Sequence, residues 1–174
     1  MVAMTAALSV SFIIRNTSPI GWPPLLLMKI AYDGSLKPIL MAGFFVFFPL
    51  VAFGIGLDSL YFGEFPVITS YNFIKANILD GKSNYFGVES ASTYIYHYIP
   101  KYLPALVPAL IVGLFFYTRD CYIGGRKPYM LVLCATYLGV FSAINHKEER
   151  FMLPIVPFIV LISGYAVEKI TKAA

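Results

Sequence analysis

The sequence predicts an all-α protein, a polytopic bundle of transmembrane helices. Of the 174 residues, 59% are hydrophobic and only 13% are charged, whereas a soluble domain usually has about 25% charged residues. The 15 Phe and 13 Tyr exclude a disordered chain, because disordered segments contain few aromatic residues. The apolar residues also come in blocks that are too long for a helix with one face in water. These observations exclude an ordinary soluble enzyme and predict an integral membrane protein.

The apolar blocks predict about five or six membrane segments in a single transmembrane domain, 1–174. A spanning helix needs about 20 apolar residues, and Pro38–Leu57 is such a block without a charged residue. The segment 20–30 is short and contains Pro23 and Pro24, which is typical of a broken or re-entrant helix. The expected spans lie near 2–14, 20–30, 38–57, 94–117, 129–145 and 151–167.

The long connector 58–93 is expected to be folded, because unstructured loops of this length are uncommon. Within it, Val67–Leu79 has apolar residues near helical spacing, which predicts a helix lying along the membrane surface. The alternative is a cap packed over the bundle.

The positions of Lys and Arg predict the orientation of the chain in the membrane. Basic residues concentrate in 29–37, 118–128 and 168–174, which the positive-inside rule assigns to the cytosol. The connectors 58–93 and 146–150 then share the opposite side, which is the lumen of an endomembrane. Thirteen basic residues spread over several short loops make no nucleic-acid patch, so the expected partners are membrane lipids and no nucleic acid.

The turn between the last two predicted spans is the strongest candidate site. It reads His-Lys-Glu-Glu-Arg from His146 to Arg150, and charges at membrane depth are costly and tend to mark a site. Pro154 and Pro157 follow, and each removes a backbone donor at the start of the next span. The alternative is a charged turn that only ends two helices.

Three stretches resemble the dolichyl-phosphate-mannose-dependent mannosyltransferases, glycosyltransferase family 22. His146–Pro154 (HKEERFMLP) is similar to the hallmark motif of this family, and Phe12–Pro24 (FIIRNTSPIGWPP) to its Arg-Pro-Thr segment and Trp-Pro region, with Asn16 where Pro is usual. Asp58–Gly87 is similar to its long lumenal loop. After Gly87 the family usually has Thr-x-Pro-Trp, and here the chain reads Val-Glu-Ser-Ala.

The resemblance implies a GT-C-type multi-pass protein of the endoplasmic reticulum membrane. It implies transfer of mannose, with inversion, from dolichyl phosphate mannose to a lipid-linked glycan acceptor. The GPI-anchor precursor is slightly favoured over the N-glycan precursor, because Asn72–Asn77 is similar to the GPI branch of the family. Such enzymes are about three times longer, so the chain is expected to be a middle fragment that is inactive alone. The alternatives are a non-catalytic or truncated membrane subunit and a transporter, although no inverted repeat is visible.

The resemblance also implies roles for individual side chains. The donor phosphate needs fixed cations, and the candidates are His146, Lys147, Arg150 and Arg15. The residues expected to orient the substrate are Glu148, Glu149 and Asp58. The family places its presumed catalytic base upstream of Met1, which leaves Asp58 and Glu64 as the fallback within this chain. No Asp-rich metal motif is present in the sequence, so neither a metal nor another cofactor is expected.

Overall fold

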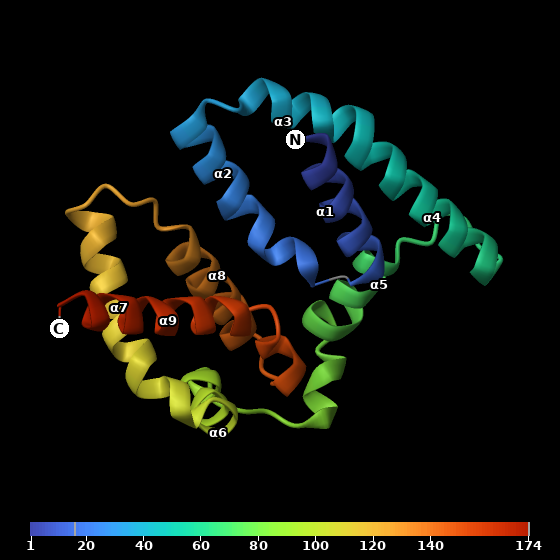
Figure 1. Cartoon of the computed structure of the whole chain (residues 1–174). Helices are drawn as coiled ribbons and strands as arrows, with labels where there is room; N and C mark the ends of the chain where they lie inside the picture. The colour runs from blue at the N-terminus through green and yellow to red at the C-terminus, as the bar shows by residue number, and fades with distance from the viewer. Residues whose placement is uncertain (16, 174) are drawn as a thin grey trace. The chain divides into compact units, whose positions relative to one another are not determined.

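The computed structural model describes residues 1–15 and 17–173, together with the backbone but not the side chain of Ile78, and it is all-helical (Figure 1). The chain divides into two compact units, Met1–Ser83 and Asn84–Ala174. Asn16, where the sequence departs from the family pattern, lies outside the described residues.

The first unit contains one long apolar helix. Leu36–Phe62 is 27 residues long with a mean hydropathy of 2.3, and at 1.5 Å per residue it extends about 40 Å, enough to cross a bilayer core of about 30 Å. Gly34 and Gly63, at φ 63° and 71°, mark its two boundaries and supply the left-handed conformation that other residues avoid. The helices of this region are α1 (Val2–Ile14), α2 (Trp22–Asp33), α3 (Leu36–Ala42), the π-helix η2 (Gly43–Phe47) and α4 (Phe48–Phe62).

The first unit is held together by an aromatic cluster. The rings of Phe12, Trp22 and Phe47 lie 6.0 to 6.2 Å apart and bring together α1, α2 and η2. Aromatic pairs at such spacing are stabilising beyond the area they bury. The single Trp of the chain therefore lies in the packing between helices.

The connector expected at 58–93 contains several short helices. The helix α4 continues five residues past Leu57, so Asp58 lies on its last turns. The expected helix at 67–79 is confirmed as α5 (Thr69–Ile74) followed by the π-helix η3 (Lys75–Leu79), and the 3-10 helix η4 covers Lys82–Phe86. Whether α5 and η3 lie on a membrane surface stays a prediction.

The second unit begins with short helical pieces separated by prolines. These are the π-helix η5 (Tyr94–Tyr98), α6 (Ile99–Tyr102) and η6 (Pro104–Leu106). Both η2 and η5 end two residues before a proline, Pro49 and Pro100. Because proline cannot donate to the helical ladder, the preceding turn widens into a π-turn at these places.

Longer helices form the rest of this unit. They are α7 (Val107–Tyr122), α8 (Tyr129–Ala143) and α9 (Val156–Ala173), with the 3-10 helix η7 (Glu149–Met152) before α9. Within the described residues, two helices are long and apolar enough to cross a membrane, Leu36–Phe62 and Pro104–Tyr122.

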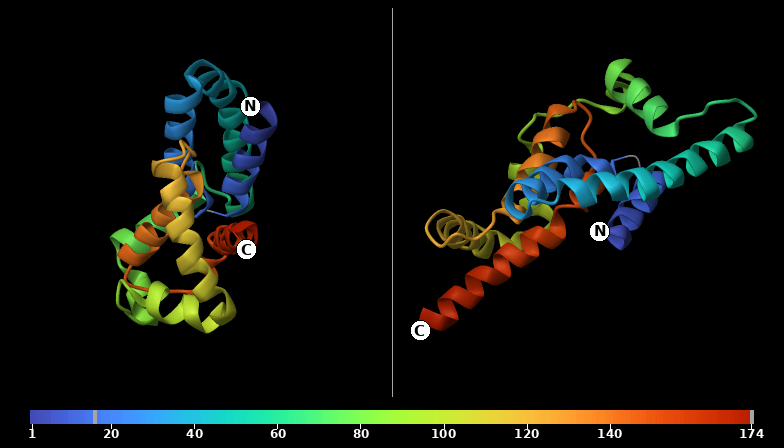
Figure 2. Two further views of the ribbon diagram at one scale, coloured as in Figure 1. Left: turned by 60° about the vertical axis from the view of Figure 1, so that its left-hand side comes forward. Right: turned by 90° about the horizontal axis from the view of Figure 1, so that it is seen from above.

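The helices α7 and α9 cross and pack closely (Figures 1 and 2). Gly113 faces the backbone of Ile162, and a Cβ added at Gly113 would lie 2.0 Å from the Ile162 carbonyl oxygen. Further along, Asp120 of α7 contacts Tyr165 and Lys169 of α9. The C-terminal ends of both helices therefore lie at the same end of the second unit.

The core of the second unit lies where α8 and η7 meet. The rings of Phe141 and Phe151 stack at 4.6 Å with only 6° between their planes. Ile155 and Tyr94 are almost fully buried and belong to the same core. This packing fixes the turn between α8 and α9, which carries the candidate motif.

Candidate functional site

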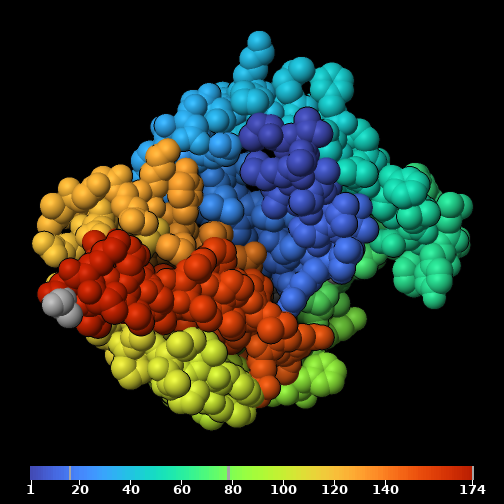
Figure 3. All heavy atoms as spheres, viewed as in Figure 1, coloured from blue at the N-terminus to red at the C-terminus, as the bar shows by residue number. Residues whose placement is uncertain are grey.

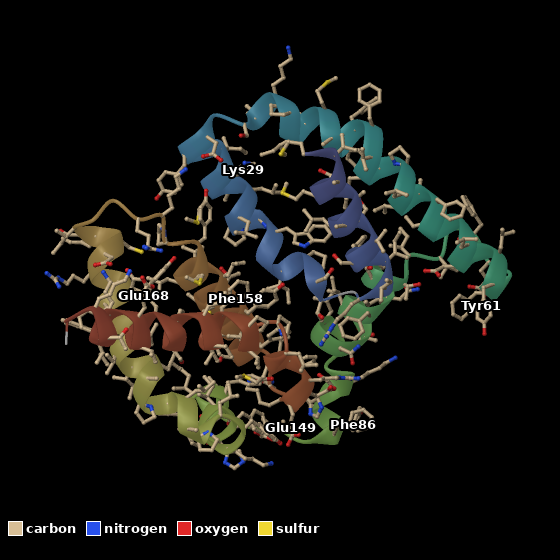
Figure 4. All side chains as sticks on the ribbon, viewed as in Figure 1. Lys29, Tyr61, Phe86, Glu149, Phe158 and Glu168 are labelled. Carbon is tan, nitrogen blue, oxygen red and sulfur yellow. The ribbon has the colours of Figure 1, made fainter. Side chains whose placement is uncertain are left out.

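The His146–Arg150 segment forms the turn between α8 and α9. The helix α8 ends at Ala143 because Ile144 takes an extended conformation, with ψ at 130°. Pro154 and Pro157 prevent an early restart of regular hydrogen bonding, so the chain passes through η7 before α9 begins. In Figure 4, Glu149 and Phe86 mark this end of the second unit, and Glu168 marks the other.

Lys147 points into the turn. Its side chain is buried, with the residue only 4% exposed, and its Nζ donates hydrogen bonds to the carbonyls of Ser142 (2.9 Å) and Ile144. Carbonyls at the end of a helix have no partner within the helix and favour a nearby cation. Burial lowers the pKa of Lys147. The ammonium group therefore holds the end of α8, and its charge is directed at backbone oxygens.

Tyr94 fixes the same turn from a distant part of the chain. The residue is 1% exposed, its hydroxyl donates to the Glu148 carbonyl at 3.4 Å and it accepts from the Glu148 amide at 3.2 Å. Its ring lies 5.9 Å from the Lys147 ammonium, within cation–π range. A single buried tyrosine thus contacts two consecutive residues of the motif.

Glu148 links the two outer cations of the motif. Its carboxylate contacts the Arg150 guanidinium through both oxygens, one of them at 3.0 Å from Nη2, and lies 3.5 Å from Nε2 of His146. The forked pairing of Arg with a carboxylate fixes orientation as well as charge. The Arg150 side chain is 67% exposed, so Glu148 orients a side chain that lies largely at the surface.

His146 is held by the segment that precedes η5. Its Nδ1 lies 3.2 Å from the Gly87 carbonyl oxygen, and its ring lies 6.0 Å from that of Phe86. Its two ring nitrogens therefore face a backbone acceptor and the Glu148 carboxylate. This arrangement positions Glu148, which in turn positions Arg150.

Glu149 is directed to a different partner. It pairs with Lys101 at 3.1 Å on the exposed surface. Hydrogen bonds from Tyr102 and Lys101 lower the pKa of the Glu149 carboxyl. The two adjacent glutamates therefore have different partners. Glu148 pairs with residues of the motif, and Glu149 pairs with Lys101 of α6.

Glu89, Tyr94 and Tyr98 support the motif, a structural role that the sequence did not predict for them. The Glu89 amide donates to the Asn145 carbonyl at 3.1 Å, and the Tyr98 hydroxyl donates to the Glu89 carboxylate at 3.2 Å. Glu89 belongs to the stretch that departs from the family pattern. The run of tyrosines at 94–98 is typical of a membrane-interface belt, and only the low exposure of Tyr94 and Tyr98 separates them from such a belt.

The other candidate residues belong to the first unit. The Nε of Arg15 donates to Thr17 Oγ1 at 3.1 Å, and Asp58 accepts a short hydrogen bond from Thr69. A hollow of about 100 Å³ includes Asp58 and Thr69 in its lining, and one of about 320 Å³ is lined by Phe62, Glu64, Val67, Thr69 and Asn72. Asp58 and Glu64 therefore each line a hollow of the first unit, and Thr69 lines both hollows.

No three His, Cys, Asp or Glu side chains are grouped to hold a metal ion anywhere in residues 1–15 and 17–173. The motif end of the second unit offers instead charged and hydrogen-bonding groups suited to a polar, anionic ligand. The described residues thus form an all-helical protein with two candidate membrane spans and a charged turn between α8 and α9.

The comparison with known proteins gives the family. The model of the Alg9-like mannosyltransferase family matches residues 1–174, and the chain belongs to this family. It is 26% identical over 167 residues to a human protein named GPI alpha-1,2-mannosyltransferase 3, which covers 95% of this chain and 29% of that protein. No solved structure matches the chain.

Two further relatives come from a fungus and a plant. GPI mannosyltransferase 3 of Yarrowia lipolytica is 26% identical over 94% of this chain and 30% of its own length. A mannosyltransferase of Arabidopsis thaliana is 29% identical over 88% of this chain and 26% of its own length. The chain therefore spans less than a third of the length of these relatives.

Proposed function

We propose that the chain is part of a mannosyltransferase that transfers mannose from dolichyl phosphate mannose to a lipid-linked glycan. A hydroxyl of the acceptor attacks the anomeric carbon of mannose, and the bond from that carbon to the phosphate oxygen breaks. The hydroxyl proton passes to a carboxylate base, and dolichyl phosphate leaves with the bonding electron pair. Family membership supports the reaction class, and the names of the relatives favour the GPI-anchor precursor as acceptor over the N-glycan precursor.

The observation that carries this proposal is the exposed Arg150 side chain, oriented by Glu148, which His146 contacts in turn. As the bond to mannose breaks, negative charge grows on the phosphate, and a preoriented cation stabilises that charge more in the transition state than in the ground state. Arg is suited to this role because its planar fork matches two phosphate oxygens. We assign Arg150 to the donor phosphate.

The other candidates act through Arg150 or on the sugar. Lys147 points to backbone carbonyls, so we propose that it supports donor binding by holding the turn. His146 positions Glu148. Asp58 and Glu64 remain the carboxylates within this chain that we propose for orienting sugar hydroxyls or for the base, and Arg15 is proposed as a further donor contact.

The arrangement of the second unit supports a multi-pass orientation in the endoplasmic reticulum membrane. The cationic ends of α7 and α9 lie together, while Lys101 and Glu149 pair near the motif. By the positive-inside rule, we propose that the α7 and α9 ends face the cytosol and the motif faces the lumen.

Donor binding can be tested on the chain itself in nanodiscs of neutral lipid. The probe is a photoactivatable dolichyl phosphate mannose, and the variant is Arg150→Ala. We expect labelling to weaken by roughly 10- to 150-fold, because a hydrogen bond to a charged group contributes about 1.5–3 kcal/mol. Arg150→Lys should recover only part of the labelling.

The matched control is Lys172→Ala, which removes the same charge from a surface pair at the other end of the unit. It should label as the unmodified chain does. Equal labelling of Arg150→Ala and the unmodified chain would contradict the assignment. Binding of GPI and N-glycan precursors in the same nanodiscs then ranks the two acceptors, and tighter binding of the N-glycan precursor would overturn our preference.

A further inference from the structure

A cluster of charged residues lies at the end of the second unit opposite the motif. We call it the basic end and define it as residues 118–128 and 168–173. It contains five cations and two carboxylates, a net side-chain charge of +3. Figure 3 shows the α7–α8 connector and the last turns of α9 close together on this face. The residues are Arg119, Asp120, Arg126, Lys127, Glu168, Lys169 and Lys172.

The two carboxylates already have partners on α9. Asp120 accepts from the Tyr165 hydroxyl and pairs with Lys169 at 2.6 Å. Glu168 pairs with Lys172 at 2.6 Å. The carboxylates of the basic end therefore compensate the two lysines of α9.

Arg126 is held in another way, by the faces of two tyrosines. Its guanidinium carbon lies 4.9 Å from the Tyr165 ring centre and 5.7 Å from that of Tyr117. These two rings are buried and meet edge to face at 5.6 Å, so the support is rigid. The Arg126 amide also donates to the Asp120 carbonyl at 3.2 Å. Within the described part of the chain, no carboxylate forms an ion pair with Arg126.

A guanidinium stacked on aromatic rings has its face occupied, and its N–H groups point outward in the plane of the fork. This geometry suits a phosphate, which accepts two such hydrogen bonds at once. The ammonium of Lys169 lies over the same Tyr165 ring at 5.2 Å, but Asp120 compensates its charge, so Arg126 supplies the uncompensated positive charge at this ring. The site is therefore built for an anion with several oxygens.

The position along the chain indicates which phosphate binds there. Arg126 follows α7, which ends the apolar segment Pro104–Tyr122, so it lies at the level where lipid headgroups meet a spanning helix. Tyr122 and Ile123 are strongly exposed beside it and offer apolar contact for acyl chains. A soluble phosphate compound would gain nothing from these two side chains.

We propose that Arg126 binds the phosphate of an acidic phospholipid, supported by the rings of Tyr117 and Tyr165. The site is separate from the donor phosphate proposed at Arg150 and does not depend on the mannosyltransferase proposal. Bound lipid would fix the depth and tilt of α7 and α9 in the bilayer.

The test uses the whole chain purified in a neutral detergent and native mass spectrometry. The probes are phosphatidylinositol and phosphatidylcholine in equal amounts, with inorganic phosphate added in a separate arm. We expect the chain to retain phosphatidylinositol preferentially, and Arg126→Ala to weaken this retention about tenfold, as expected for a charge-assisted phosphate contact.

Lys172→Ala, which removes the same charge from a residue paired with Glu168, should leave retention unchanged. Arg126→Lys keeps the charge but not the fork, and should retain an intermediate amount.

Two results would overturn the proposal. Equal losses in Arg126→Ala and Lys172→Ala would mean that the charge acts diffusely and that no site exists. Displacement of the lipid by millimolar inorganic phosphate would mean that the cluster binds free phosphate. Since Arg126 is exposed, its variants are expected to fold, and circular dichroism of each variant checks this.

Discussion

The two ends of the second unit hold an exposed arginine in different ways. At the motif end, the carboxylate of Glu148 orients Arg150, and Lys147 and Tyr94 hold the turn beneath it. At the basic end, two tyrosine rings support Arg126, and the nearby carboxylates pair with lysines. A carboxylate partner orients an arginine but makes the pair neutral. An aromatic partner leaves the net positive charge in place.

This difference suits the two ligands that we propose. The donor phosphate proposed at Arg150 has to be released after each turnover, and a cation whose charge Glu148 partly compensates suits such release. The phospholipid proposed at Arg126 stays bound, and an uncompensated cation suits such retention. The following predictions test whether the two ends behave independently.

The largest expected effect comes from the contact that aligns α7 and α9. In Gly113→Ala, the new Cβ would clash with the Ile162 carbonyl, which belongs to rigid backbone. We expect a loss of roughly 1–3 kcal/mol of stability, typical of overpacking, and weaker lipid retention at the basic end. The measurement is thermal unfolding in detergent together with native mass spectrometry.

Gly139→Ala is the matched control, because a Cβ at Gly139 of α8 would meet nothing within 4 Å. Its stability should stay the same or rise slightly, since Ala favours a helix more than Gly does. If both glycine variants unfolded at the same temperature, α7 and α9 would not pack as described.

A smaller effect is expected from the hydroxyl of Tyr94. Tyr94→Phe keeps the buried ring and removes the group that bonds both the amide and the carbonyl of Glu148. The expected loss is about 1 kcal/mol of stability, with weaker donor labelling at Arg150 and unchanged lipid retention at Arg126. Donor labelling and lipid retention, measured on one preparation, separate the two ends.

Tyr85→Phe provides the comparison, because Tyr85 is largely exposed and no contact of its hydroxyl is recorded with the described residues. It should leave both readouts unchanged. If Tyr94→Phe lowered lipid retention as much as donor labelling, the two ends would be coupled and the comparison would fail.

The sequence predicted the helical fold and the motif turn, but not how the turn is supported. The length of the apolar block was sufficient to predict the long helix Leu36–Phe62. The spacing of apolar residues was sufficient to predict the helix within 67–79. Both signals are local in the sequence. The inward direction of Lys147 and the contact of Tyr94 with Glu148 depend on residues far apart in the chain. Position in the sequence cannot distinguish a lysine that faces a ligand from one that ends a helix, since both occur in charged turns.

The smallest effect compares one exposed carboxylate at each end, Glu149 and Glu168. Hydrogen bonds from Tyr102 and Lys101 lower the pKa of Glu149, and a hydrogen bond from Lys172 lowers that of Glu168. A carboxyl whose pKa is lower in the folded state stabilises the fold above its unfolded pKa, about 4.3 for Glu. That contribution disappears as the pH falls through the pKa of the folded state.

Glu149→Gln and Glu168→Gln should therefore each unfold at a slightly lower temperature than the unmodified chain at neutral pH, and the differences should vanish in acid. Because both pairs are exposed and screened by solvent, both differences should be small and should shrink in high salt. A difference that persisted below the folded pKa would mean that the glutamine disturbs packing and that the ion pair contributes nothing to that end.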